Sequence, residues 1–144
     1  MKAITLWQPW AQLVAIGEKT VETRSWPTKY RGEIAIHAAK NLPSKSTYNH
    51  LRSLSTKADG SPSVLGPFQD LPKGCIVAIA ELHDVQPTPM KFEPYMLQWL
   101  STPREYAYGN FSPGRYMWFL KNIKGLDKPI PAKGYQRIWE WEEE

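Results

Sequence analysis

Apolar residues occur along the chain in short runs, and turn-forming residues separate these runs. The clearest run, Cys75 to Leu82, is apolar at nearly every position, which is typical of a strand that is covered on both faces. Other runs rich in apolar or β-branched residues predict strands over residues 2–6, 19–24, 33–38, 115–122 and 129–133. The pattern therefore predicts five or six short strands.

Helical periodicity follows directly after the first of these strands. Pro9 suits the first turn of a helix that carries Trp10, Leu13 and Val14 on one side, and Gly17 is a natural stop for it. Short helices or helical turns are also predicted at residues 46–54, 94–100 and 103–108, with a loop around Gly60 and Pro62. Short strands combined with short helices predict an α+β fold around a curved sheet or barrel.

The composition is that of an ordinary globular protein. Its 144 residues suit one domain, residues 1–144, and 42% are hydrophobic. No apolar run approaches the roughly 20 residues that span a membrane, and the first residues lack the apolar middle of a signal peptide. The single cysteine, Cys75, excludes an internal disulfide and a zinc site built on several cysteines. We therefore expect a cytoplasmic protein without membrane association, metal or cofactor.

The 18 basic residues outnumber the 14 acidic residues, and the excess is uneven along the chain. Residues 1–57 contain nine bases and three acids, whereas residues 140–144 contain four of the acids. A basic body that also carries seven tryptophans can attract phosphate groups and stack on nucleic-acid bases. The alternative is that the bases keep the protein in solution and the tryptophans fill its core.

The densest group of polar side chains lies in residues 17–24, where four charges and two hydroxyls occur within eight residues. In an extended segment Thr20, Glu22 and Arg24 share one face. Lys19 lies at the mouth of this strand, where its side chain can bend toward a ligand. The alternative is an exposed strand with a surface ion pair of little energetic value.

A second polar group lies in residues 105–118, where glycines at 109 and 114 shape a turn that leads into a strand. It contains Glu105, Arg115 and three tyrosines, and the alternative for it is a tight loop of packed aromatic rings. The three histidines have no metal-ligand spacing, and no phosphate-cradling glycine motif occurs. Spacing alone therefore identifies no reaction.

Several of these segments together resemble an ASCH domain. They are residues 4–11, the GxKxxExR element at 17–24 with Trp26 after it, residues 30–32, 34–40, 74–78 and 108–116, and residues 134–139. The resemblance runs in order from residue 3 to about 141. It implies a PUA-like fold, which is a small mixed β-barrel with flanking short helices. It also implies a cleft beside the first helix, with RNA or a modified nucleoside as the ligand.

Some members that this chain resembles cleave RNA without a metal ion, and we expect an RNA- or nucleotide-binding protein that acts as a metal-independent ribonuclease on single-stranded RNA. Cleavage needs a base for the 2′-hydroxyl, cations for the phosphorane and an acid for the leaving oxygen. We expect Lys19 to act as the base or as the cation on the phosphate, and Glu22 to orient Lys19 or to accept from a base edge. The remaining candidates for RNA contact are Trp7, Trp10, Arg24, Trp26, Lys40, Tyr108, Ser112, Arg115 and Tyr116.

The resemblance leaves two alternatives open. Other members deacylate a modified nucleoside, acetylated cytidine, and their lysine aligns with Lys19. Their nucleophilic threonine lies three residues later, at the position of Glu22 in this chain, whereas Thr20 shares its face and Glu105 is the nearest counterpart of their catalytic acid. The second alternative is an RNA-binding module without catalysis, since the fold alone does not define a reaction.

Overall fold

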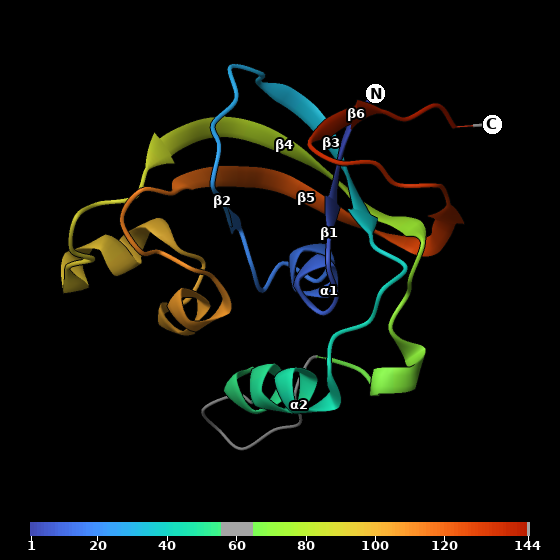
Figure 1. Ribbon diagram of the computed structural model, residues 1–144, viewed down its shortest axis with the longest axis horizontal. Helices are drawn as coiled ribbons and strands as arrows, with labels where there is room; N and C mark the ends of the chain where they lie inside the picture. Colours follow the sequence, from blue (N-terminus) through green and yellow to red (C-terminus); the bar gives the residue numbers. More distant parts are fainter. Residues whose placement is uncertain (56–64, 144) are drawn as a thin grey trace.

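The computed structural model describes residues 1–55 and 65–143, so the loop predicted around Gly60 and Pro62 lies outside the described residues. Within these residues six strands form one sheet in the order β2–β5–β4–β3–β1–β6. The strands are β1 (Lys2–Leu6), β2 (Val21–Arg24), β3 (Gly32–Ala38), β4 (Cys75–Pro87), β5 (Tyr116–Pro131) and β6 (Ile138–Glu140). β1 and β3 are parallel and the other pairs are antiparallel. The mixed α+β architecture is therefore confirmed, as a curled half-barrel sheet (Figure 1).

Short helices cover one side of this sheet. They are α1 (Trp10–Ala15), α2 (Lys45–Leu54) and the 3₁₀ helices η1 (Phe68–Asp70), η2 (Pro94–Trp99) and η3 (Pro103–Tyr108). α1 lies directly under the sheet and α2 lies farther from it (Figure 1). Gly17 ends the turn after α1 with a φ of +78°, a left-handed conformation that glycine adopts without strain. None of the described helices is long and apolar enough to span a membrane.

α1 separates two apolar cores. Its Ala11 and Val14 pack into the main core, together with apolar side chains of β1, β3, β4 and β5. Leu13, on another side of the helix, packs with Tyr48 and Leu51 of α2 and with Tyr108 of η3. The helix therefore ties α2 and η3 to the sheet, and the space between these elements becomes available for a ligand.

β4 continues past its predicted end at Leu82 to Pro87, and three other features of the predicted sheet also differ. The strand expected over 19–24 begins at Val21, because the backbone N–H of Lys19 bonds to the carbonyl of Leu13 in the turn after α1 (3.0 Å). The strands expected over 115–122 and 129–133 form one strand, β5, which pairs with β4 across several register shifts. β6 was not predicted; its three residues become a strand only because β1 offers a free edge to pair with.

Candidate functional site

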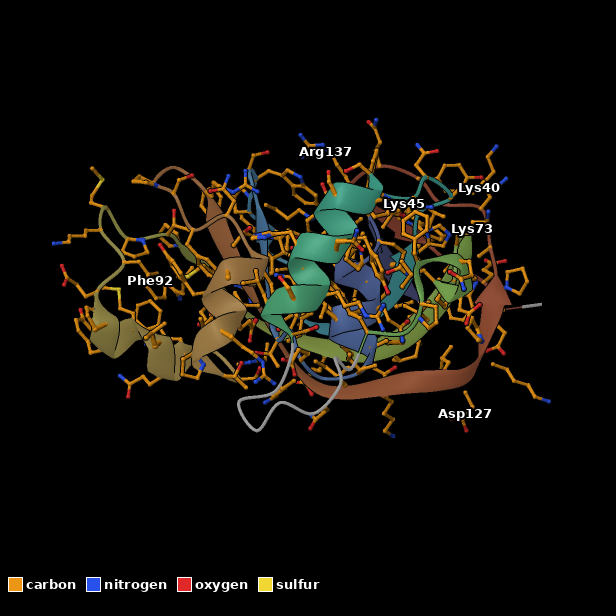
Figure 2. All side chains as sticks on the ribbon, turned by 90° about the horizontal axis from the view of Figure 1, so that it is seen from below. Lys40, Lys45, Lys73, Phe92, Asp127 and Arg137 are labelled. Atoms are coloured by element: carbon orange, nitrogen blue, oxygen red, sulfur yellow. The ribbon has the colours of Figure 1, made fainter. Side chains whose placement is uncertain are left out.

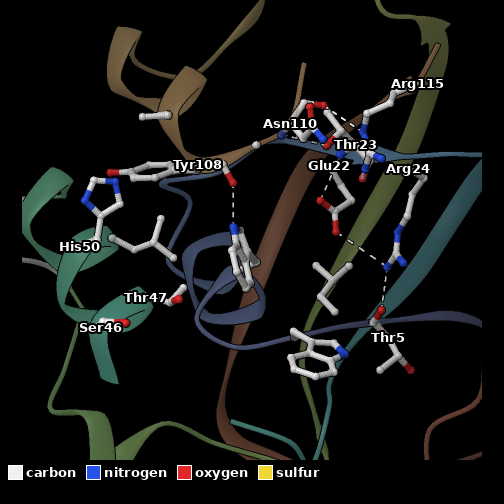
Figure 3. Close-up of a pocket in the computed structure, with 16 residues that line it drawn as sticks. Thr5, Glu22, Thr23, Arg24, Ser46, Thr47, His50, Tyr108, Asn110 and Arg115 are labelled. Atoms are coloured by element: carbon white, nitrogen blue, oxygen red, sulfur yellow. Dashed lines mark hydrogen bonds and ion pairs between the residues drawn. The ribbon is translucent and has the colours of Figure 1, made fainter. Parts of the chain in front are cut away.

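A cleft of about 640 Å³ opens between α1, β2, α2 and the segment that follows η3. Its lining residues are Thr5, Leu6, Trp7, Trp10, Glu22, Thr23, Arg24, Ser46, Thr47, His50, Leu51, Ala107, Tyr108, Gly109, Asn110 and Arg115 (Figure 3). A hollow of this size falls in the range of small-molecule and cofactor sites, about 300–1,000 Å³. It therefore has room for a nucleotide-sized ligand.

Arg24 and Glu22 form a charged pair at the β2 side of the cleft. A guanidinium nitrogen, Nη2, of Arg24 donates to the carbonyl of Thr5 (2.6 Å) and lies 3.7 Å from a carboxylate oxygen of Glu22 (Figure 3). The Nε of Arg24 is buried and makes no hydrogen bond within residues 1–55 and 65–143. The side chain as a whole is partly exposed and lines the cleft, so other N–H groups of this guanidinium can contact a ligand.

Arg115 enters the same cleft from the turn before β5. Its Nη2 donates to the carbonyl of Thr23 and its Nε to the carbonyl of Asn110, both at 3.1 Å. The side chain of Thr23 in turn accepts the backbone N–H of Asn110 (3.2 Å). These contacts hold Arg115 in one orientation, so that its remaining N–H groups can bind an anion without a large entropy cost.

Lys19 is fully buried next to Glu22 of the Arg24–Glu22 pair. Its ammonium group donates to the carbonyl of Val21 (2.6 Å) and lies 3.7 Å from Glu22. A Cβ at Gly109 would lie 3.5 Å from the Lys19 ammonium nitrogen and 2.9 Å from the ring of Phe111, so this position has no space for a side chain. Lys19 therefore contacts Glu22 and does not line the cleft, whereas the sequence predicted a side chain that bends toward a ligand.

Glu105 lies behind β2 and does not line the cleft. It is fully buried, and its two carboxylate oxygens accept five hydrogen bonds. The donors are the backbone N–H groups of Thr20 (2.8 Å), Val21 (2.7 Å) and Ser101 (2.9 Å) and the hydroxyls of Thr20 and Ser101 (both 3.0 Å). The structure therefore brings Thr20 and Glu105 into contact with each other, but outside the cleft that Glu22 and Arg24 line.

Aromatic side chains line the cleft on the side of α1. Trp7 is 53% exposed, and Trp10 donates its indole N–H to the carbonyl of Tyr108 (2.7 Å). The hydroxyl of Tyr108 points away from these groups and donates to Glu18 (3.0 Å). Burial, reinforced by this hydrogen bond, raises the pKa of Tyr108 well above its usual range. Tyr108 therefore stays neutral and serves as a wall of the cleft.

The other predicted contact residues lie outside the cleft. Trp26 and Tyr116 pack against the main core, and Trp26 meets Trp118 edge-to-face at 4.8 Å. Ser112 is exposed and bonds to the side chain of Asn110 (2.7 Å). Lys40 is exposed at the end of β3, where its aliphatic chain packs beside Gly74. The structure thus gathers six of the predicted residues in the cleft, which are Trp7, Trp10, Glu22, Arg24, Tyr108 and Arg115.

The wall opposite β2 was missed from the sequence. Ser46, Thr47 and His50 of α2 line the cleft, and His50 brings an exposed imidazole group to it (Figure 3). No spacing in the sequence connects α2 with residues 22–24, because loops and the packing of α1 set their distance. In the part of the chain that the structure describes, no group of three or more His, Cys, Asp or Glu side chains is placed to hold a metal ion.

A curled six-stranded mixed sheet with a few short helices and an aromatic-lined cleft beside the first helix defines a small α+β domain. The sequence profile of the ASCH domain matches residues 4–130. The chain therefore belongs to the ASCH domain family, which is linked to RNA binding, and the resemblance found in the sequence is confirmed.

Two curated relatives share part of their length with this chain. It is 29% identical to Activating signal cointegrator 1 of Mus musculus and of Homo sapiens over 136 residues, which are 94% of this chain and 21% of each relative. The chain thus spans about a fifth of these relatives. The crystal structure of ASCH from Zymomonas mobilis has a TM-score of 0.51 and 18% identity, covering 90% of this chain and 72% of that one. This likeness shows a common fold.

Proposed function

We propose that this protein binds single-stranded RNA in the cleft and cleaves it without a metal ion. The observation that carries the proposal is the pair of guanidinium groups of Arg24 and Arg115, which backbone carbonyls fix on the β2 side of the cleft. Trp7 adds an exposed ring on which a base can stack. Fixed cations combined with an exposed aromatic ring are the usual means of holding single-stranded nucleic acid.

The cleavage step uses groups on opposite walls of the cleft. The 2′-hydroxyl oxygen attacks the adjacent phosphorus while Glu22 accepts the hydroxyl proton. Arg24 and Arg115 stabilise the charge of the phosphorane, and the bond from phosphorus to the 5′-oxygen breaks. His50 donates a proton to this leaving oxygen, which gives a 2′,3′-cyclic phosphate and a 5′-hydroxyl. Lys19 positions Glu22 and does not touch RNA in this scheme.

Two features of the geometry favour RNA over an acetylated nucleoside. Deacylation of a single nucleoside calls for an enclosed cavity, whereas this cleft is open to solvent. It also calls for a nucleophile, and the hydroxyl of Thr20 donates to Glu105 outside the cleft. An open cleft instead admits a ligand that continues in both directions, as an RNA strand does.

Binding is tested by fluorescence anisotropy with a labelled single-stranded RNA of about ten nucleotides in the presence of a chelator. Arg24→Gln and Arg115→Gln are each expected to weaken binding about tenfold or more, because charge-assisted contacts to phosphate are worth about 1.5–3 kcal/mol. Lys91→Gln is the matched control, since Lys91 is exposed on the loop that precedes η2 and does not line the cleft. Binding that is equal in all three variants would refute the proposed cleft.

Cleavage is tested on the same RNA by gel electrophoresis, again in chelator. Glu22→Gln is expected to abolish the cyclic-phosphate product while RNA still binds. Cleavage that persists unchanged in this variant points to a contaminating nuclease and refutes the catalytic step. Binding without cleavage by the unaltered protein leaves an RNA-binding module. Release of acetate from acetylated cytidine, measured by chromatography, would instead support the deacylase.

A further inference from the structure

A row of basic side chains begins where the cleft ends. The cleft wall includes Leu6 at the end of β1, and the carbonyl of Leu6 accepts the backbone N–H of Ala39 at 2.9 Å. Lys40 is therefore the next residue beyond the wall. On its other side, Gly74 approaches so closely that a Cβ there would lie 3.1 Å from Cγ of Lys40. This contact brings Lys73 beside Lys40, and Figure 2 shows the two lysines at the same end of the molecule.

A third lysine continues the row. The carbonyl of Gly74 accepts the backbone N–H of Ala132 (3.1 Å), and Lys133 follows directly. The three lysines thus lie two residues beyond the adjacent ends of β3, β4 and β5, at one end of the sheet. We call Lys40, Lys73 and Lys133 the basic ledge. With strands about 4.8 Å apart, the distance from β1 across to β5 is about 14 Å.

The ammonium groups of the basic ledge are available to an external anion. All three lysines are exposed, and within the described residues none of them pairs with a carboxylate. Lys133 lies over the exposed ring of Tyr135, 5.6 Å from its centre. Glu140 and Glu142 line the same shallow hollow as Lys133, but Glu140 already pairs with Lys2 and with the N-terminal ammonium group.

We propose that the basic ledge binds the phosphates of an RNA strand that leaves the cleft past Leu6 and Trp7. This inference rests on the proposed function and makes it more specific, because the ligand becomes a strand of several nucleotides in place of one nucleotide. Unpaired lysines in a row that continues from an aromatic-lined cleft provide the electrostatic path that single-stranded nucleic acid follows. The basic ledge adds affinity without reading sequence.

Two measurements distinguish the basic ledge from the cleft. Each phosphate neutralised on a single strand contributes about −0.7 to the slope of log affinity against log salt. Replacing the three lysines with glutamine should therefore reduce the slope by about 2. The same variant should lose about tenfold in affinity for an RNA of about ten nucleotides, since each exposed charge contact is worth about two- to threefold. It should bind a dinucleotide like the unaltered protein.

The experiment compares the unaltered chain with three variants by fluorescence anisotropy at several salt concentrations. The variants are Lys40→Gln/Lys73→Gln/Lys133→Gln, the cleft variant Arg24→Gln, and a control with Lys91→Gln/Lys121→Gln/Lys124→Gln. The control removes the same charge from exposed positions elsewhere on the protein, so it corrects for the change in net charge. Thermal melts of all four proteins confirm that they fold.

The outcomes separate the two proposals. The basic ledge is overturned if the ledge variant has the same salt slope, and the same dependence of affinity on RNA length, as the control. If affinity is then lost only in Arg24→Gln, the cleft proposal stands. A loss in the ledge variant with none in Arg24→Gln overturns the cleft, and with it the path of the strand from the cleft to the basic ledge. An unaltered protein that binds no RNA of any length overturns both. Binding to vesicles of anionic lipid that depends on the three lysines, with RNA binding unaffected, assigns the surface to a membrane and overturns the proposal.

Discussion

The carboxylate of Glu105 joins two segments that are far apart in the chain, and its replacement gives the sharpest test of the architecture around β2. The variant Glu105→Gln keeps nearly the same volume but exchanges one acceptor oxygen for an amide NH₂. In the native protein one oxygen accepts the backbone N–H groups of Thr20 and Val21, and the other accepts the N–H and hydroxyl of Ser101 and the hydroxyl of Thr20. The hydroxyls can rotate, but the three backbone N–H groups cannot.

The magnitude follows from which donor loses its acceptor. The glutamine oxygen still accepts the backbone N–H groups of Thr20 and Val21, because the bond from Val21 is buried and is the costlier one to lose. The new NH₂ group then faces the backbone N–H of Ser101. A donor left without its acceptor costs about 1–3 kcal/mol, and the surviving bonds lose their charge assistance. Because Ser101 is exposed and water reaches it, we expect a loss of about 2 kcal/mol in total. For a domain of this size that lowers Tm by about 4–8 °C.

The assay is a thermal melt followed by circular dichroism, with Glu33→Gln as the control. Glu33 is exposed on β3, so its replacement removes the same charge without removing buried hydrogen bonds. A Tm for Glu105→Gln within about 1 °C of the control would refute the role of this carboxylate in holding Thr20, Val21 and Ser101 together. A variant with unchanged Tm but no RNA cleavage would place Glu105 in the chemistry instead.

Three further predictions concern other residues. Trp7→Ala should weaken RNA binding about fivefold or more, because stacking on one base is worth about 1–3 kcal/mol; Tyr95→Ala, at an exposed ring on η2 outside the cleft, is the control in the same titration, and equal effects would contradict stacking in the cleft. Burial lowers the pKa of His37, so the unfolded chain takes up the proton first as the pH falls below about 6.5. Tm should therefore fall between pH 7.5 and 5.5, and by less in His37→Gln; parallel curves for the two proteins would show that His37 is not responsible. Burial raises the pKa of Cys75, so a thiol reagent at pH 8 should label the native protein far more slowly than the urea-unfolded protein, whereas equal rates would mean an accessible thiol.

The pattern of apolar and polar residues was enough to predict the helices and strands that are specified by their local sequence. The apolar and β-branched residues at 2–6 and the continuous apolar run after Gly74 predicted β1 and the start of β4, since burial of a strand produces such runs directly. Gly17 marked the end of α1 because a left-handed turn favours glycine. The GxKxxExR element also placed Glu22 and Arg24 on one side of a strand, and the structure has them 3.7 Å apart.

Only the tertiary structure decided which of these elements face one another. Glu105 bonds to Thr20 across 85 positions of the chain, and His50 reaches the cleft from a helix that no spacing relates to β2. Residues 116–131 form one long strand because β4 pairs with both its ends and its middle across several register shifts, despite the glycine and prolines within it. The physical reason is that local pattern specifies which face of an element is apolar. Which distant faces meet depends on strand register and on the packing of α1 between two cores, and both are properties of the whole chain.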